Sequence, residues 1–426
     1  MTRIALLSSE AIRPRMAGIG IRYLELARRL PRPGLEVVLV TPGEPDEVPD
    51  EGRAGEDRTA EVRRFECGRL REILADCDGA VCQGQLANDL LLEVPELPAA
   101  IDLYDPFLVE NLYYAETLGL DPYRNDHATW VLQMSRGDFF LCSCEEQRQF
   151  YLGFLAALGR LNPERVGRDP DLDGLIAIVP FGVDARLPGH RPLLPERRPG
   201  EQRLLFGGLY DWYDPWPVLE ALEIADEPGW TLYFIRNPNP EGTPQALFAE
   251  VEDWCRRRGW WDRRVRALDW IPSARRYDLL RDVDLLVSTH VQSLETRLSL
   301  RTRFLDALAA DCPVVISEGG AMSRLLRDHD AGWVVPPRDP AAVAAALGEI
   351  LAGGEPVAAR RRGGAELLRG FAWETVLEPL LRFCEKPEAD PTKPAFAFRP
   401  PTVAPPDRPG FRARRWLRRK LKVGTP

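Results

Sequence analysis

The sequence lacks any run of about 18 apolar residues, the length that a membrane-spanning helix requires. Its first ten residues, MTRIALLSSE, also lack the pattern of a secretory signal peptide. The eight cysteines form no CxxC pair, and Cys82, Cys142 and Cys312 lie in or beside apolar, strand-like runs. We therefore expect a cytoplasmic protein whose cysteines are reduced and buried, rather than bound to a metal or to each other.

Histidine and cofactor motifs are also scarce. The four histidines lie far apart in the sequence, so no metal-binding cluster emerges. The glycines Gly18 and Gly20 open a predicted helix, but they lack the full GxGxxG pattern and a ribose-binding acid at the expected distance. We expect neither a metal nor a nicotinamide cofactor.

Charge is distributed unevenly along the chain. The net charge is −9, but residues 412–422, RARRWLRRKLK, hold seven basic residues and no acid, so the remainder carries −16. A body that acidic is a poor binder of nucleic acid, and a tail that basic favours an anionic surface.

The 426 residues, 45% of them hydrophobic, are typical of a globular protein with more than one core. Strand-like runs and amphipathic helices alternate twice, first from RIALLSS and GIGIRYLELARRL, and again from RLLFGGLYDWYDPWPVLEALE. This predicts an α/β protein with two doubly wound, Rossmann-like domains. We place them at residues 1–190 and 200–370, joined by a Pro-rich linker, with a closing helix at 371–386.

Residues 387–426 predict a Pro-rich linker and a basic amphipathic tail. The first part has proline at nearly every third position and should be extended, without a packed core. In the second part Trp416, Leu417 and Leu421 share one stripe of a helix flanked by arginines, as in helices that bind anionic membranes. A disordered solubilising tail or an RNA-binding segment are the alternatives.

Five segments of the chain, in order, resemble bacterial glycosyltransferases of family 4 and their relatives. They are AGIGIRYLELARRL with GLEVVLVTP, DFFLCSCEEQRQFYLGFLAALGRLNPE with VPFGV, FGGLYDWYDPW, ETRLSLRTRFLDALAADCPVVISEGG and AGWVVPPRD. The resemblance covers roughly residues 1 to 385. It implies the GT-B architecture, in which two Rossmann-like domains face each other across a cleft. It also implies a nucleotide-sugar donor held mainly by the C-terminal half, an acceptor held mainly by the N-terminal half, and retention of anomeric configuration.

The fourth of these segments, which begins ETRLSLRTRF, contains residues that we expect to bind a diphosphate. Arg301 and Arg303 precede or begin a predicted helix, Thr302 to Ala310, whose N–H groups and dipole also attract anions. Glu295 and Asp306 are candidates for sugar and ribose hydroxyls. Relatives carry two acids separated by seven residues here, whereas this chain has leucine eight positions before Asp306, so Glu295 would act from a longer loop. The alternative is a solvated helix cap with surface arginines.

The loop after the first strand of the C-terminal half departs further from the family. Relatives place an Arg and a Lys there, but GGLYDWYDPW has no basic residue. Gly207 and Gly208 still permit close approach of a ligand to the backbone. Tyr210, Trp212 and Tyr213 line the donor pocket in one interpretation, and form an aromatic patch between domains in the other. The missing charges indicate either an altered donor site or an inactive relative.

Two further loops are assigned by resemblance. Trp270 and Ile271, in ALDWIPS, resemble the loop that reads the base, mostly through backbone groups, which leaves uracil, thymine and guanine open. Gly319 and Gly320 resemble the loop that faces the sugar.

The N-terminal half supplies the acceptor and phosphate residues. The helix after Gly18 and Gly20 should direct free N–H groups into the cleft, and in the family this loop contacts the donor phosphate and the acceptor; a plain helix-entry turn is the alternative. Asp102 and Asp105 end a strand, where they are expected either to bind acceptor hydroxyls or to cap a helix.

The sequence therefore predicts a retaining, metal-independent glycosyltransferase with a nucleotide-sugar donor, a glycan or lipid-linked acceptor and no separate cofactor. The DxD pairs Asp171/Asp173 and Asp282/Asp284 match the manganese pattern of another glycosyltransferase fold, but their positions favour structural roles. Another GT-B enzyme, such as a nucleotide-sugar epimerase, and a catalytically inactive partner remain as alternatives.

Overall fold

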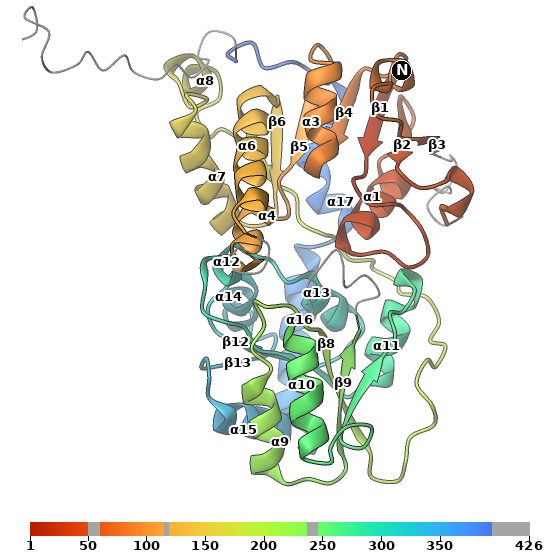
Figure 1. Cartoon of the computed structure of the whole chain (residues 1–426), viewed down its shortest axis with the longest axis vertical. Coiled ribbons are helices and arrows are strands. Elements are labelled where there is room, and N and C mark those ends of the chain that lie inside the picture. Colours follow the sequence, from red (N-terminus) through yellow and green to blue (C-terminus); the bar gives the residue numbers. More distant parts are fainter. Residues whose placement is uncertain (50–59, 115–118, 237–245, 394–426) are drawn as a thin grey trace, which may run out of the picture.

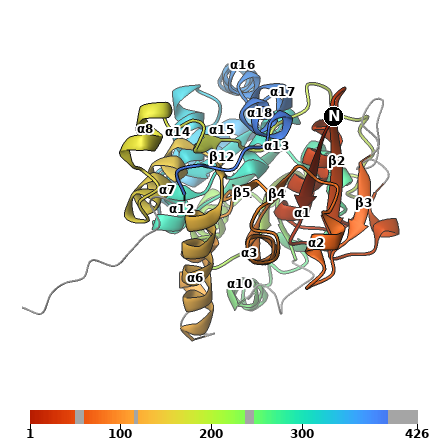
Figure 2. The ribbon, with the colours of Figure 1, turned by 90° about the horizontal axis from the view of Figure 1, so that it is seen from above.

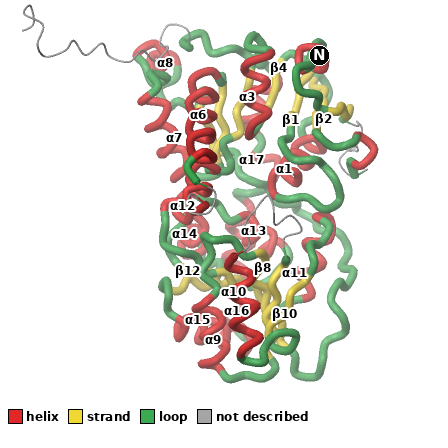
Figure 3. The backbone as a smooth tube through the Cα atoms, viewed as in Figure 1, coloured by secondary structure: helices red, strands yellow, loops and turns green. Residues whose placement is uncertain are grey.

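The computed structural model describes residues 1–49, 60–114, 119–236 and 246–393. Two α/β halves are stacked along the longest axis of the molecule (Figure 1), each with helices around a central sheet (Figure 3). The basic amphipathic segment predicted near the C-terminus lies outside the described residues.

The N-terminal half contains a seven-stranded sheet in the order β3-β2-β1-β4-β5-β6-β7, paired in parallel throughout. Its strands are β1 (Thr2–Leu7), β2 (Leu35–Thr41), β3 (Glu61–Arg64), β4 (Gly79–Cys82), β5 (Ala99–Asp102), β6 (Phe139–Cys142) and β7 (Ile176–Ile178). The strand order reverses between β1 and β4. The carboxyl ends of these two strands therefore form a topological switch point, where sheets of this kind bind ligands.

The C-terminal half contains a six-stranded parallel sheet in the order β10-β9-β8-β11-β12-β13. Its strands are β8 (Gln202–Gly208), β9 (Trp230–Ile235), β10 (Val265–Leu268), β11 (Leu285–Ser288), β12 (Val314–Ser317) and β13 (Trp333–Val335). Counted from β8, this is the 3-2-1-4-5-6 order of a Rossmann sheet, with its switch point between β8 and β11. The predicted class, two doubly wound α/β units, is confirmed.

Helices cover both faces of each sheet. In the N-terminal half they are α1 (Gly18–Arg29), α2 (Leu70–Ile73), α3 (Gly84–Glu93), α4 (Phe107–Glu110), α6 (Asp121–Arg136), α7 (Glu145–Ala157) and α8 (Pro163–Arg168). In the C-terminal half they are α9 (Trp216–Ala225), α10 (Ala246–Arg257), α11 (Arg276–Asp282), α12 (Leu294–Leu298), α13 (Thr302–Ala309), α14 (Ala321–Asp328), α15 (Pro340–Ala352) and α16 (Glu355–Arg369).

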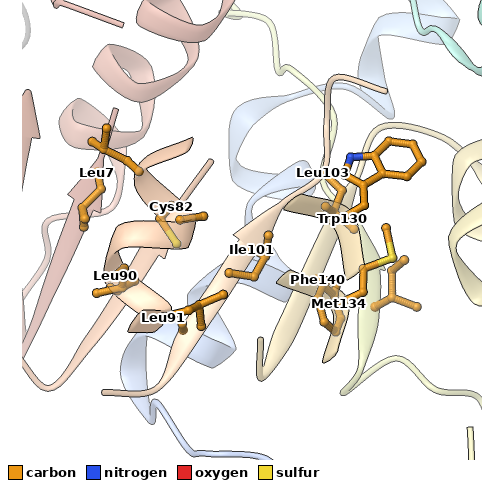
Figure 4. Packing of buried hydrophobic residues seen from close by; sticks show 14 of the residues in the cluster. Leu7, Cys82, Leu90, Leu91, Ile101, Leu103, Trp130, Met134 and Phe140 are labelled. Carbon is orange, nitrogen blue, oxygen red and sulfur yellow. The ribbon is translucent and has the colours of Figure 1, made fainter. Parts of the chain in front are cut away.

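Adjacent residues of one strand belong to different cores. In β1, Ala5 and Leu7 pack into the core under α3 and α6, whereas Ile4 and Leu6 pack into the core under α1. Figure 4 shows part of the first core, where the strand residues Leu7, Cys82, Ile101 and Phe140 lie near Leu90, Leu91, Trp130 and Met134 of the helices. A parallel strand that is buried on both faces needs apolar side chains at every position, which explains the continuous apolar runs in the sequence.

The chain returns to the N-terminal half after α16. The returning segment forms α17 (Trp373–Val376) and α18 (Glu378–Glu385), so the one closing helix predicted at 371–386 is in fact two short helices. Figure 2 shows α18 on the opposite side of the N-terminal sheet from α3 and α6. The outgoing and returning segments touch, because the Val183 N–H donates to the Phe371 carbonyl at 2.7 Å.

The beginning of the predicted Pro-rich linker is packed, contrary to the expectation for residues 387–393. Asp390 has a fully buried carboxylate that lies 2.8 Å from both Arg160 Nη2 and Arg165 Nη2. The Thr392 N–H and hydroxyl also donate to Asp390 Oδ1, at 2.9 and 2.8 Å. These contacts tie the segment to the end of the N-terminal half that lies farthest from the C-terminal half (Figure 1).

Within the described ranges, no single helix is long and apolar enough to cross a membrane. The helices α15 and α16 reach that composition only as a pair, and they are bent by 95° to each other.

Candidate active site

The loops after β8 and β11 meet at the switch point of the C-terminal sheet. Tyr213 forms an antiparallel bridge with His290, and the Asp214 N–H donates to the Thr289 carbonyl at 3.0 Å. These main-chain contacts give the loop that follows Gly208 a fixed conformation, so its side chains are held in defined positions.

The segment that links α12 to α13 lies where the two halves meet. Leu298, on α12, is 4% exposed and belongs to the core of the N-terminal half. Its carbonyl accepts from Cys144 Sγ at 3.6 Å, and the Leu300 carbonyl accepts from Tyr104 Oη at 3.3 Å. The predicted phosphate-binding arginine Arg301 follows directly, so it lies at the junction of the halves.

Glu295 is engaged within its own segment. Its side chain is 0% exposed, its Oε2 lies 2.5 Å from Arg301 Nη2, and its Oε1 accepts from Ser299 Oγ at 2.7 Å. Because both oxygens are occupied and buried, the role predicted for Glu295 toward sugar hydroxyls is not supported in this arrangement. The carboxylate instead holds Arg301.

Arg303 lies against the carboxyl end of β8. Its Nη1 donates to the Phe206 carbonyl at 3.4 Å, and its Nη2 donates to the hydroxyl of Tyr213. Gly207 makes room for it, because a Cβ at that position would lie 2.7 Å from Arg303 Nη1 and the φ of Gly207 is +92°. Among the described residues, no carboxylate comes within 4.0 Å of the Arg303 guanidinium. Within the described residues, Arg303 is therefore a cation without a carboxylate counter-ion at the switch point.

A neutral histidine lies beside these arginines. His290 is 3% exposed, and burial, followed by the positive charges of Arg301 and Arg303, lowers its pKa well below the ordinary value. It therefore adds no third positive charge. The sequence offered no signal for it beyond a histidine after a strand.

The aromatic side chains of the loop after β8 are stacked. The rings of Tyr210 and Trp212 lie 5.0 Å apart with an angle of 10° between their planes, and Gly208 lies beside Tyr210. Their role in donor binding stays a prediction.

Asp306 lies apart from the arginine cluster, in a second group. Its Oδ1 accepts from Arg276 Nε at 3.3 Å, and Arg276 also donates to the Ser273 carbonyl at 3.2 Å. Ser273 belongs to the loop after β10, which contains Trp270 and Ile271. The predicted ribose acid and the predicted base-reading loop are thus brought together, through an arginine that the sequence did not single out.

The loop after β10 contacts the N-terminal half. Trp270 Nε1 donates to the Met16 carbonyl at 3.4 Å, and the Ser273 N–H donates to the Pro14 carbonyl at 3.0 Å. Ile271 is partly buried against the core around α11 and α13.

The two glycines after β12 allow close packing. A Cβ on Gly319, whose φ is +132°, would lie 2.6 Å from Gln292 Nε2, and a Cβ on Gly320 would collide with the Thr296 carbonyl. The diglycine therefore lets this loop approach α12, and its contact with a sugar stays a prediction.

The N-terminus of α1 already has an anion. Glu10 accepts from the Ala17 N–H at 2.6 Å through Oε1 and from the Gly20 N–H at 2.8 Å through Oε2. The N–H groups that the sequence led us to expect free after Gly18 are thus partly occupied. An acid a few residues before a helix was the available signal, since carboxylates are favoured at helix N-termini.

Asp102 requires a correction. Its carboxylate is buried in a two-pronged ion pair with Arg22, with distances of 2.6 Å to Nε and 3.2 Å to Nη2. Arg22 also donates to the Val179 carbonyl at 2.8 Å. Asp102 therefore neither binds an acceptor nor caps a helix in this arrangement, and its partner lies too far away in sequence to be inferred locally.

Asp105 remains at the switch point of the N-terminal half. Its Oδ2 accepts from Gln83 Nε2 at 3.3 Å, and Gln83 Oε1 accepts from Ser9 Oγ at 3.0 Å. Burial, followed by the negative charge of Asp102, raises the pKa of Asp105 to about 6.

A second acid, Glu110, also has a raised pKa. Burial, followed by the negative charges of Asp105 and Glu295, raises the pKa of Glu110 well above its ordinary value. Both carboxyl groups therefore keep their protons to a higher pH than ordinary ones do, and Glu110 had no sequence signal.

The second DxD pair holds the linker between the halves. Asp282 Oδ2 accepts from the N–H groups of Leu193 and Leu194 at 2.6 and 2.7 Å, and Asp284 Oδ2 lies 2.7 Å from Arg197 Nη1. In the part of the chain that the structure describes, no three His, Cys, Asp or Glu side chains are grouped so as to hold a metal ion.

The known proteins that this chain resembles in sequence are glycosyltransferases. The sequence profile of the family described as "Glycosyl transferases group 1" matches residues 218–353. A phosphatidyl-myo-inositol mannosyltransferase of Mycobacterium leprae (strain TN) is 30% identical over 121 residues, which are 28% of this chain and 31% of that protein.

Two solved structures share the fold over most of both chains. The sucrose-phosphate synthase of Thermosynechococcus elongatus has a TM-score of 0.61 at 16% identity, covering 90% of this chain and 98% of that chain. HepE of Anabaena, in complex with UDP, has a TM-score of 0.57 at 15% identity, covering 90% and 99%. The predicted resemblance is confirmed, because the profile of a glycosyltransferase family matches about a third of the chain and the solved structures share the two-domain GT-B fold.

Proposed function

We propose that the protein is a retaining glycosyltransferase that moves a hexose-type sugar from a nucleotide-sugar to a glycan or lipid-linked glycan. The observation that carries this proposal is the Arg303 guanidinium, which lies at the end of β8 with no carboxylate within 4.0 Å among the described residues. A cation in that position suits the diphosphate that leaves when the glycosidic bond of the donor breaks.

The donor is expected to lie along the C-terminal half. Arg303 contacts the diphosphate, Arg301 adds positive charge beside it while paired with Glu295, and Asp306 with the loop at Trp270 lies near the nucleoside. UDP bound to HepE supports a nucleoside diphosphate as the ligand class. Transfer would not need a divalent metal, since the arginines supply the positive charge.

The acceptor is expected at the switch point of the N-terminal half. We assign the acceptor hydroxyl to Asp105 rather than to Asp102, because the carboxylate of Asp102 is already paired with Arg22. Hydrogen bonds from Ser9 to Gln83 and from Gln83 to Asp105 hold the Asp105 side chain in place. The name of the mannosyltransferase relative includes the phospholipid phosphatidyl-myo-inositol, which supports a lipid-linked acceptor. A role in the synthesis of cell-surface polysaccharide is part of the same proposal.

The membrane tether is part of the same proposal. Residues 409–426 lie outside the described residues and are proposed to bind anionic lipid on the inner face of the membrane through arginine, lysine and Trp416. Deleting them should abolish co-sedimentation with anionic vesicles but leave donor binding intact. Equal vesicle binding by the full and shortened chains would refute the tether.

A panel of UDP-, GDP- and dTDP-sugars tests the proposal. The purified protein should hydrolyse one of them slowly, with and without a chelator, and should release the sugar with its anomeric configuration retained. Activity that is abolished by chelator and restored by manganese would contradict the metal-independent mechanism.

A catalytically inactive partner is the second candidate, favoured by the absence of basic residues after Gly208 and by the ion pairs that occupy Glu295 and Asp102. It predicts nucleotide binding without any turnover of the panel.

A further inference from the structure

Arg303 does not come from the loop where a basic residue would be expected. The stretch GGLYDWYDP, residues 207–215, follows β8 and contains neither Lys nor Arg. The cation beside the backbone of Gly207 instead comes from the first turn of α13, and its position therefore depends on whatever holds the side chain there.

Tyr213 holds that side chain. Its hydroxyl accepts from Arg303 Nη2, and the Arg303 Cζ lies 4.9 Å from the centre of its ring. The Arg301 Cζ lies 5.4 Å from the same ring. Two guanidinium groups thus share one aromatic ring, whose negative π-face attracts both and offsets part of their mutual repulsion.

Tyr213 is itself fixed from several sides. It is 3% exposed, its N–H donates to the Tyr210 carbonyl at 2.9 Å, and its ring lies 5.0 Å from that of His290. Because the lowered pKa keeps His290 neutral, its imidazole does not compete with the two arginines for the face of the Tyr213 ring. A long, flexible arginine gains a defined orientation when its donor is bound to such a rigid acceptor.

We infer that Tyr213 is a positioning residue that holds Arg303 against the end of β8, so that a cation from α13 binds the diphosphate in place of the basic residues absent after Gly208. The inference rests on the proposed function and adds to it the residue that organises the phosphate subsite. It also gives Gly207 a role, since any side chain there would displace Arg303.

The test is a double-mutant cycle on nucleoside diphosphate binding. Calorimetry measures the affinity of whichever of UDP, GDP or dTDP binds the wild-type protein. Tyr213→Phe keeps the ring and removes the hydroxyl, and it should weaken binding about tenfold, as expected for a hydrogen bond to a charged group. In the Arg303→Ala background the same change should have no further effect, because the residue that Tyr213 positions is gone.

Tyr233→Phe is the matched control. Tyr233 is also a buried tyrosine of the C-terminal sheet, but its hydroxyl donates to Glu201 Oε1 at 3.3 Å, before the start of β8. This variant should bind the nucleotide like the wild type. A Tyr213→Phe protein that binds within twofold of the wild type, or that loses the same factor with and without Arg303, overturns the inference. If the wild type binds none of the three nucleotides and consumes none of their sugars, the proposed function itself fails.

Discussion

The guanidinium of Arg301 is paired with the buried carboxylate of Glu295, with 2.5 Å between Nη2 and Oε2. The neighbouring Arg303 has no such partner among the described residues. Two arginines that look equivalent in the sequence are therefore different in charge balance. One belongs to a structural ion pair, and the other is available to an anionic ligand.

We expect replacement of the two arginines to separate binding from stability. Arg303→Ala should remove about 2 to 4 kcal/mol of transition-state stabilisation while leaving the fold intact. Arg301→Ala should also lower the free energy of unfolding by about 3 to 5 kcal/mol, because Glu295 would remain buried without its partner. Kinetics with the active nucleotide-sugar and urea denaturation measure the two effects.

Arg297→Ala is the control for this pair, since Arg297 is exposed on α12. It should change neither quantity appreciably. Wild-type turnover and affinity in the Arg303→Ala protein would contradict the assignment.

Glu10→Gln should tighten the binding of a nucleoside diphosphate by about threefold to fivefold, a gain of the size expected for one charge at a helix N-terminus. The carboxylate now occupies the N–H groups of Ala17 and Gly20, and its negative charge competes with a phosphate for them. Calorimetry on the variant checks this, with Glu374→Gln, an exposed change of equal charge, as control. Weaker binding by the Glu10 variant would mean that the carboxylate helps to hold the ligand.

Asp105→Asn should stabilise the protein at alkaline pH. In the folded chain the pKa of Asp105 is raised from 3.8 to about 6, so at pH 8 the carboxylate is ionised at an electrostatic cost that the unfolded chain does not have. The melting temperature of the variant should exceed that of the wild type at pH 8. The difference should shrink as the pH falls through about 6 toward 4, where the wild-type carboxyl group is protonated in the folded state.

The exposed Asp46→Asn serves as control and should show no such pH-dependent difference. A difference between Asp105→Asn and the wild type that is constant from pH 4 to pH 8 would show that Asp105 does not titrate in this range.

Asp390→Ala should lower the free energy of unfolding by about 3 to 5 kcal/mol, because it leaves the buried guanidinium group of Arg160 and the partly buried one of Arg165 without their anion. Glu388→Ala, which removes an exposed partner of Lys386, should cost less than about 1 kcal/mol. Chemical denaturation distinguishes the two. Equal, small losses would show that the segment 387–393 is not anchored through Asp390.

The doubled α/β architecture could be predicted from the sequence because parallel strands with both faces buried are apolar throughout, as in RIALLSS and PVVIS. The strands β3 (Glu61–Arg64) and β13 (Trp333–Val335) are harder to recognise, because they lie at the edges of their sheets and have only four and three residues. Three of the four residues of β3 are polar because an edge strand keeps solvent contact, so the apolar pattern that identifies central strands is absent there.

The sequence by itself also determined which loops carry arginines, acids and glycines at the strand ends. Only the tertiary structure decided which of these charges are already neutralised. Asp102 pairs with Arg22 from a distant part of the chain, Glu10 covers the start of α1, and Arg303 reaches Gly207 from α13. Whether an ionised side chain is structural or available to a ligand depends on which opposite charge lies within a few ångströms of it, and that is set by the packing of elements far apart in sequence.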